Sequence, residues 1–373
     1  MTNAKHTSVR TPFVRLAKRS SIGAARAWCI RVAAVLLALV INALLIYTIT
    51  KMNPLQVYVS MFKGAFGSTR RIWNFIREGC MLLCISVALA PAFKMRFWNI
   101  GAEGQVLAGG IATAACMIYL GGKLPTPLLF LVMVLASVAA GALWGFIPAL
   151  FKAKWGTNET LFTLMMNYIA IQITSYCVAL WENPYGSNKV GIINPQTKAG
   201  WFPKLFGQQY TWNVLIVLAL TVLVFLYLKY SKQGYEIAVV GESENTARYA
   251  GINVRHVILR TMLISGAVCG IAGFIGVAGV DHTISTNTAG GRGFTAIIIA
   301  WLAKFNTITM VIITSLIVFL NQGAGQIVSD FSKLGINDYV AEIIKGIILF
   351  FILGSEFFVN YRLIFRGSTK TNG

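Results

Sequence analysis

Three groups of polar residues interrupt otherwise apolar stretches of the sequence, and their side chains could contact a ligand in an apolar environment. The first group comprises Asn99, Glu103 and Gln105, between apolar runs that end at Phe93 and resume at Val106. Charged groups at membrane depth are costly, so they usually face a protein interior or a water-filled path. The same residues could instead form a turn and a helix start, in which Glu103 favours the helix dipole. Both interpretations stay open from the residues alone.

The second and third groups stand before later apolar runs. Asn158 and Glu159 open a run that also contains Asn167, whereas Asn287 and Phe294 lie around a glycine-rich segment. Asn is a good N-cap and Glu suits a first helical turn, so capping explains much of the second group.

No arrangement of residues in the sequence indicates catalysis. The chain has only 3 histidines, and no Ser/His/acid set, HExxH motif or Walker A motif can be placed. The 6 cysteines lie in or beside apolar runs without the clustering that a zinc site needs. We therefore expect no catalytic site, no metal and no cofactor, and any energy from ATP would arrive through a partner.

The composition is that of a polytopic membrane protein. Of the 373 residues, 56% are hydrophobic and only 12% are charged, about half of the share in soluble domains. The formal net charge is +20, but the basic residues are spread between apolar runs. They are typical of topology determinants and lipid-headgroup contacts, and no nucleic-acid module is present.

Apolar runs predict an all-α fold of ten transmembrane helices. The second and eighth runs are short, which predicts broken helices near the centre. The expected spans are 30–50, 79–94, 104–121, 127–150, 158–180, 212–230, 261–280, 290–304, 307–323 and 338–360.

The distribution of Lys and Arg places both termini in the cytoplasm. Residues 1–29 then form a basic cytoplasmic segment, 30–360 the transmembrane domain and 361–373 a cytoplasmic tail. Five spans follow five, so any homology between the halves would be an inverted repeat. The links 99–105 and 281–293 are its matching elements, since both are polar and glycine-rich.

Two polar segments stand outside the spans. Turn formers in 181–211 predict an ordered outer loop. In the cytoplasmic segment 231–260, residues 244–249 predict a short helix with Ser243 as N-cap and Gly251 as its end. That helix could be a docking element for a partner protein or an ordinary loop helix.

Glycines recur at helix-packing spacing within two of the expected spans. Gly141 with Gly145, and Gly266 with Gly270, are each four residues apart. Small residues at this spacing allow close approach of membrane helices.

Four segments resemble motifs of ABC-transporter permeases for nucleosides and simple sugars. They occur in the family's order and cover roughly residues 30–360. The sequence is most similar to the longer permease of the nucleoside branch, because of its extended N-terminus and the 181–211 loop. The four segments are Phe97–Gln105, Gly156–Ile169, Gly241–Gly266 and Gly293–Ala300.

The resemblance implies an importer at the plasma membrane that moves nucleosides, with a simple sugar such as ribose as the alternative substrate. An ion-driven secondary transporter is the rival from another class. The implied partners are a cytoplasmic ATPase, a second and usually different permease chain, an extracytoplasmic substrate-binding lipoprotein and membrane lipids. The implied pathway residues are Asn99, Glu103, Gln105, Asn158, Glu159, Asn167, Asn287 and Phe294, and the implied ATPase contacts are Glu244, Arg248, Ala250, Gly251 and Ile252.

Overall fold

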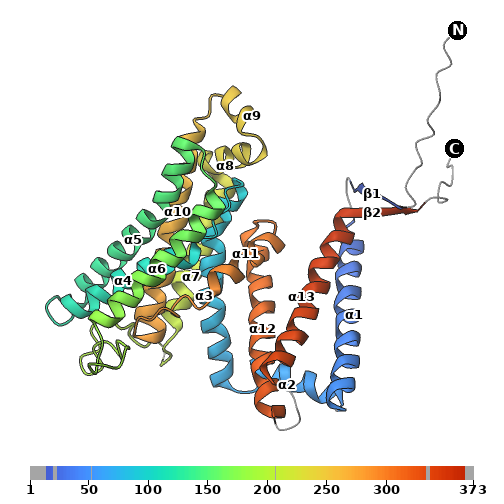
Figure 1. The fold of residues 1–373 in the computed structure, drawn as a ribbon, viewed down its shortest axis with the longest axis horizontal. Helices are drawn as coiled ribbons and strands as arrows, with labels where there is room; N and C mark the ends of the chain where they lie inside the picture. The colour runs from blue at the N-terminus through green and yellow to red at the C-terminus, as the bar shows by residue number, and fades with distance from the viewer. Residues whose placement is uncertain (1–13, 20–22, 52, 206, 333–336, 366–373) are drawn as a thin grey trace. The chain divides into compact units, whose positions relative to one another are not determined.

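The computed structural model divides into two compact units that are each described by themselves. The central unit comprises residues 65–319, and the terminal unit comprises 1–64 with 320–373. Figure 1 shows that most of the described chain is helical, which confirms the all-α class. The described residues are 14–19, 23–51, 53–205, 207–332 and 337–365.

The helices of the central unit vary widely in length, from α9 with 6 residues to α5 with 30. A π-helical segment, η1, continues α10 without a break. The helical elements of the central unit are α3 (Thr69–Lys94), α4 (Ala102–Leu120), α5 (Thr126–Trp155), α6 (Glu159–Leu180), α7 (Thr211–Tyr230), α8 (Lys232–Glu242), α9 (Glu244–Tyr249), α10 (Val254–Phe274), η1 (Ile275–Asp281), α11 (Arg292–Leu302) and the first part of α12 (Thr307–Phe331).

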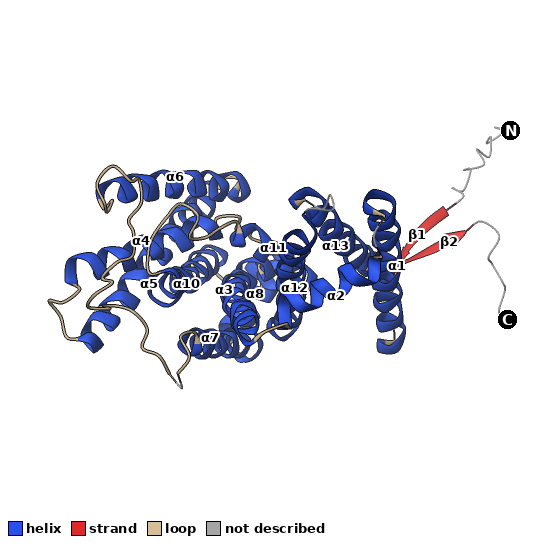
Figure 2. Cartoon of the chain, turned by 90° about the horizontal axis from the view of Figure 1, so that it is seen from below, coloured by secondary structure: helices blue, strands red, loops and turns tan. Residues whose placement is uncertain are grey.

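The core of the central unit forms around α10. It packs against α3, α4 and α5, while α6 lies on the α4 side and α7 on the α3 side (Figure 2). The contacts of α10 run through glycines: a Cβ on Gly266 would overlap the carbonyl oxygen of Gly141, and one on Gly270 would overlap that of Ser137. A Cβ on Gly145 would also touch the carbonyl oxygen of Met262, at 2.9 Å. The predicted glycine packing is confirmed.

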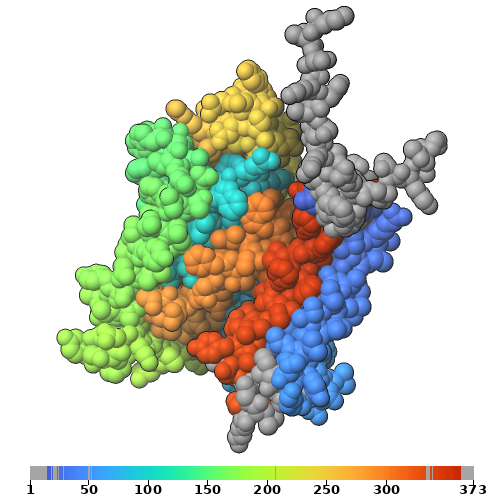
Figure 3. All heavy atoms as spheres, turned by 45° about the vertical axis from the view of Figure 1, so that its right-hand side comes forward, coloured from blue at the N-terminus to red at the C-terminus, as the bar shows by residue number. Residues whose placement is uncertain are grey.

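The terminal unit is held by contacts between the two ends of the chain. Figure 3 shows α13 (Asp338–Asn360, red) along α1 (Ala24–Thr50, blue). Arg31 pairs with Glu356 at 2.6 Å, and the buried Asn42 amide donates to the carbonyl of Ile344 at 3.1 Å. The unit also contains most of α2 (Pro54–Phe66) and two antiparallel strands, β1 (Val14–Lys18) and β2 (Tyr361–Phe365).

Eight helices among the described residues are long and apolar enough to cross a membrane: α1, α3 to α7, α10 with η1, and α12. Every expected span coincides with a helix, and the tenth is the 23-residue α13. The eighth is α11, which has only 11 residues, so its predicted shortness is confirmed. The total number of spans and the inverted repeat stay predictions.

The structure differs from the sequence-based expectation at several places, three of which concern the region around α3. The second span is not short, because α3 begins at Thr69 with Ser68 as N-cap. Charged residues such as Arg77 interrupt the apolar pattern in the first half of this helix, so the pattern alone does not reveal its start. A helix that was not expected, α2, precedes it. The link after α3 ends at Gly101 rather than 105, since α4 begins at Ala102.

We predict that Gly266→Val destabilises the protein strongly. The added side chain must push α10 away from the Gly141 carbonyl, and overpacking of this kind costs about 1–3 kcal/mol or more. The measurement is the apparent melting temperature of the detergent-purified chain. Gly79→Val is the matched control, because a Cβ at Gly79 meets no atom within 4 Å. Equal melting temperatures for the two variants would contradict the packing account.

Candidate functional site

The link between α3 and α4 is a short, buried turn. Arg96 adopts a left-handed conformation (φ 60°) just after α3. The backbone amide of Phe97 donates a hydrogen bond to the carbonyl of Ala92 at 3.0 Å. This reverses the chain direction within a few residues. Asn99 and the first turn of α4 are thereby brought into the interior of the central unit.

A closed amide network fixes this turn to α4 and α10. The Asn99 side-chain oxygen accepts hydrogen bonds from the Gly101 amide at 3.0 Å and from the Gln105 side chain at 3.2 Å. Its NH2 group donates to Gln105 Oε1 and to Ser265 Oγ, both at 3.3 Å. All three side chains are buried. A buried network with satisfied partners rigidifies its surroundings.

Helix α6 holds the same turn from the other side. Asn167 donates to the carbonyl of Ile100 at 2.9 Å and accepts from the Gly104 amide at 2.8 Å. Thr163 Oγ1 accepts from the Ile100 amide at 3.1 Å. These hydrogen bonds pair backbone groups that the break between α3 and α4 would otherwise leave without a partner. Within a membrane such groups must be hydrogen-bonded inside the protein, because lipid offers no partner.

Glu103 joins the start of α4 to the start of α11. Its Oε1 accepts from the Gly291 amide at 2.6 Å and its Oε2 from the Gly293 amide at 2.8 Å. Gly291 is the N-cap of α11 and supplies no side chain of its own. Glu103 is 7% exposed and has no ion-pair partner within the described chain. The amides and dipole of α11 therefore compensate its charge.

A second carboxylate holds the same helix start from α3. Glu78 Oε2 accepts from Arg292 Nη2 at 2.7 Å, and its Oε1 pairs with Arg77 Nη2 at 2.9 Å. Arg292 also donates to the Thr288 carbonyl at 3.3 Å. The first turn of α11 is thus fixed by two acids from two other helices.

One face of α11 and Asn287 in the loop before it are exposed at the surface of the chain. Asn287 is exposed in the loop, and Phe294 is 46% exposed in the first turns of the helix. At the other end of α11, Trp301 stacks on Trp98 with ring centres 5.1 Å apart, and both rings stay partly exposed.

The residues that open α6 form a cap and an ion pair. The Asn158 side chain accepts from the Thr160 and Leu161 amides at 3.0 and 3.2 Å. Glu159 pairs with Lys152 of α5 at 2.8 Å. Capping, the plainer interpretation of this motif, accounts for Asn158, and the ion pair accounts for Glu159.

The expected short helix is confirmed as α9, from Glu244 to Tyr249. Ser243 caps it by accepting from the Thr246 amide at 3.3 Å, and Gly251 follows with a φ of 76°. Tyr249 is 94% exposed. Figure 1 shows α9, in yellow, at one end of the central unit.

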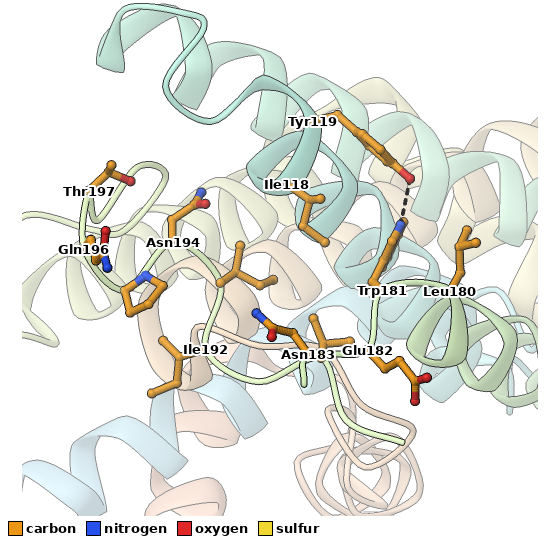
Figure 4. Close-up of a pocket in the computed structure, with 13 residues that line it drawn as sticks. Ile118, Tyr119, Leu180, Trp181, Glu182, Asn183, Ile192, Asn194, Gln196 and Thr197 are labelled. Atoms are coloured by element: carbon orange, nitrogen blue, oxygen red, sulfur yellow. Dashed lines mark hydrogen bonds between the residues drawn. The ribbon is translucent and has the colours of Figure 1, made fainter. Parts of the chain in front are cut away.

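The segment from Glu182 to Tyr210 connects α6 and α7 at the opposite end of the central unit (Figure 1). Its Trp201 ring stacks on His282 with centres 3.9 Å apart, and burial lowers the pKa of His282. With the ends of α4 and α6 it forms a pocket of about 660 Å³ (Figure 4). On the pocket wall, Trp181 Nε1 donates to the Tyr119 hydroxyl at 2.9 Å.

The structure brings only part of the predicted set together. Asn99, Glu103, Gln105 and Asn167 converge around the start of α4, and Glu103 reaches the helix that carries Phe294. Asn158 and Glu159 lie at the exposed start of α6, and the residues on and after α9 lie at the end of the unit. Sequence reasoning missed Glu78 and Ser265 as partners of this centre. An acid next to an apolar run was the available signal for Glu78.

We predict that Glu103→Ala lowers the free energy of unfolding by about 2–4 kcal/mol, because two buried amides lose a charged acceptor. The measurement is the apparent melting temperature in detergent. Glu159→Ala is the matched control: Glu159 also lies in a first helical turn, but Asn158 caps that helix. A melting temperature for Glu103→Ala no lower than that of the control would contradict the role given to Glu103.

Comparisons with known proteins agree on one family. Residues 71–353 match the family described as "Branched-chain amino acid transport system / permease component". The chain is 29% identical to the guanosine ABC transporter permease protein NupP of Bacillus subtilis, with 86% of this chain and 92% of that protein covered. It is 27% identical to the nucleoside ABC transporter permease protein NupB of Lactococcus lactis, with 80% and 84% covered.

A relative named for a different substrate covers even more of the chain. The glucose ABC transporter permease protein TsgB13 of Haloferax volcanii is 27% identical, with 94% of this chain and 93% of that protein covered. The family match alone spans well over half of the chain. The chain therefore belongs to the family of branched-chain amino acid transport system permease components, and it is a multi-pass protein of the plasma membrane.

Proposed function

We propose that the chain is a permease subunit of an ABC importer that moves nucleosides across the plasma membrane. The observation that carries this proposal is the match to relatives named for guanosine and nucleosides over 86% and 80% of the chain. The permease conducts the substrate, and a partner subunit hydrolyses ATP. Membership of a permease family favours this over an ion-driven secondary transporter.

The proposed partners occupy opposite ends of the central unit. The ATPase binds the cytoplasmic segment around α9, where Glu244, Arg248, Ala250, Gly251 and Ile252 form or follow the helix. A substrate-binding lipoprotein docks at the other end, on the side of segment 181–211. A second, different permease chain completes the transport path. Both termini lie in the cytoplasm in this proposal, as the distribution of Lys and Arg predicts.

The proposed pathway residues divide into two kinds. Asn287 and Phe294 contact the substrate, since both are exposed and offer the amide and aromatic groups that a nucleoside needs. Asn99, Gln105 and Asn167 affect the pathway indirectly, because their hydrogen bonds fix the turn before α4. Glu103 affects it indirectly as well, because it fixes the start of α11. Asn158 and Glu159 support the start of α6. Conduction needs release as well as binding, so a tight site in the permease is not expected.

We predict that cells carrying this chain with its partner subunits take up labelled guanosine. A tenfold excess of unlabelled ribose or glucose should lower that uptake less than about twofold, because a sugar that binds at least about tenfold more weakly than guanosine competes poorly. Glucose is included because of the relative named for it. Uptake of sugar without guanosine would overturn the nucleoside assignment and favour a simple-sugar permease.

We predict that Arg248→Glu lowers substrate-stimulated ATP hydrolysis about tenfold while leaving membrane insertion intact. Its side chain is 66% exposed and pairs only loosely with Glu244, at 3.6 Å, so the fold tolerates the change. Charge reversal in a docking surface typically costs at least about 1.4 kcal/mol of binding, a factor of ten.

Arg255→Glu is the matched control for this experiment, because Arg255 is exposed in the first turn of α10, just outside α9. An acid there favours the helix dipole. Equal ATP hydrolysis rates for the two variants would remove the docking role from α9.

A further inference from the structure

Helix α6 lies at the edge of the central unit and exposes one long face (Figure 2). Its other face packs on α4 and α5, and there Thr163 and Asn167 bond to the turn before α4. Because these contacts fix the rotation of α6 about its axis, the exposed face points in a defined direction. A shallow hollow of about 440 Å³ lies on this face, lined by Tyr168, Ile169, Gln172, Ile173 and Tyr176.

Three polar side chains lie in line on the exposed face. Tyr168, Gln172 and Tyr176 follow one another at intervals of four residues, which places them on one side of a helix. All three are exposed, Tyr168 by 59% and Tyr176 by 70%. Since α6 is long and apolar enough to cross a membrane, Tyr168 and Gln172, near its middle, lie at the depth of the lipid chains.

The two helices that follow and precede α6 in the chain expose apolar residues over the corresponding stretch. On α5, the exposed residues between Leu128 and Phe151 are all Leu, Ile or Ala. On α7, those between Trp212 and Leu226 are all Leu, Val or Ala. Such faces suit contact with lipid, so the exposed face of α6 differs from both of them in chemistry.

The amide of Gln172 decides against lipid on this face. It makes no hydrogen bond to another residue of the described chain, and lipid chains offer it no partner. Polar groups at this depth usually face the interior of an assembly or a water-filled path, and they mark the routes of substrates. The exposed face of α6 is therefore expected to meet water and a polar solute.

The chemistry of this face suits a nucleoside. The rings of Tyr168 and Tyr176 offer surfaces on which a base can stack, and Ile169 and Ile173 add apolar contacts between them. Gln172 can both donate to and accept from a base edge or a ribose hydroxyl. Residues 161–180 include no charged side chain, so these contacts stay weak enough for the release that conduction requires.

We propose that Tyr168, Gln172 and Tyr176 line the transport path and contact the nucleoside as it passes. This inference rests on the proposed function and adds to it, because it assigns the exposed face of α6 to the substrate rather than to lipid. Water and the substrate supply the hydrogen bonds of Gln172. The second permease chain closes the path opposite α6.

Cysteine labelling of the assembled transporter tests the proposal, in membranes opened so that both faces are accessible. Gln172→Cys should react with a sulfonated, water-soluble maleimide at least about tenfold faster than Leu218→Cys, because a thiol in lipid neither ionises nor meets the reagent. Leu218 is the matched control, since it lies on the exposed, apolar face of α7. The wild-type chain with its 6 native cysteines gives the background. Saturating guanosine should slow the labelling of Gln172→Cys at least about threefold by occupying the path.

Two labelling results would overturn the proposal. Labelling of Gln172→Cys no faster than that of Leu218→Cys would mean that the face meets lipid or the packed surface of the second permease. Labelling that guanosine leaves unchanged would mean that the face is wet but lies outside the substrate's route. Uptake of labelled guanosine by the wild type, measured in the same cells, separates these failures from failure of the proposed function. Uptake without protection of Gln172→Cys overturns this inference alone, whereas absence of uptake overturns the nucleoside assignment and the assigned contact with it.

Substitution of Tyr168 provides a second readout. At low substrate concentration, Tyr168→Ala should lower guanosine uptake about tenfold, because the base loses a stacking partner. Tyr168→Phe keeps the ring and should retain uptake within about twofold of the wild type, and Leu218→Ala should leave it unchanged. The melting temperatures of these variants should match that of the wild type, since both side chains are exposed. Equal uptake by Tyr168→Ala and the wild type would contradict a contact between this ring and the substrate.

Discussion

The hydrogen bonds from the start of α11 to the Glu103 carboxylate are the contact on which the geometry of the central unit depends. An 11-residue helix cannot cross a membrane by itself, so its first amides end inside the protein. Unpaired amides there cost several kcal/mol each. Glu103 accepts two of them, and in return the helix dipole stabilises its carboxylate, which forms no ion pair among the described residues.

The hydrogen bonds between Glu103 and the start of α11 can form only if α4 begins at a fixed position and orientation. The glycine contacts of α10 with α5 bring the helix backbones together, and the Asn99–Gln105–Ser265 network then fixes the turn before α4. Helix packing therefore positions the acid, and the acid positions α11. In the proposed permease, the same chain of contacts sets where Asn287 and Phe294 meet a substrate.

The sequence predicted features that depend on neighbours in the chain. Apolar runs identified the main helices, glycine spacing identified the packing face of α10, and capping residues identified α9 with both of its ends. Pairings across the chain were not predictable in this way: Glu103 and Gly291 are 188 residues apart, and no periodicity encodes their contact. The start of α3 was missed because charged residues in its first half interrupt the apolar pattern.

The most direct test of this account is an experimental structure of the assembled transporter in both its inward-facing and outward-facing states. The measurement is the distance from the Glu103 carboxylate oxygens to the amide nitrogens of Gly291 and Gly293. The account predicts hydrogen-bond distances in both states, with α4 and α11 moving as one body. Separation of the carboxylate from these amides in either state, while α11 stays helical from Arg292, would contradict it.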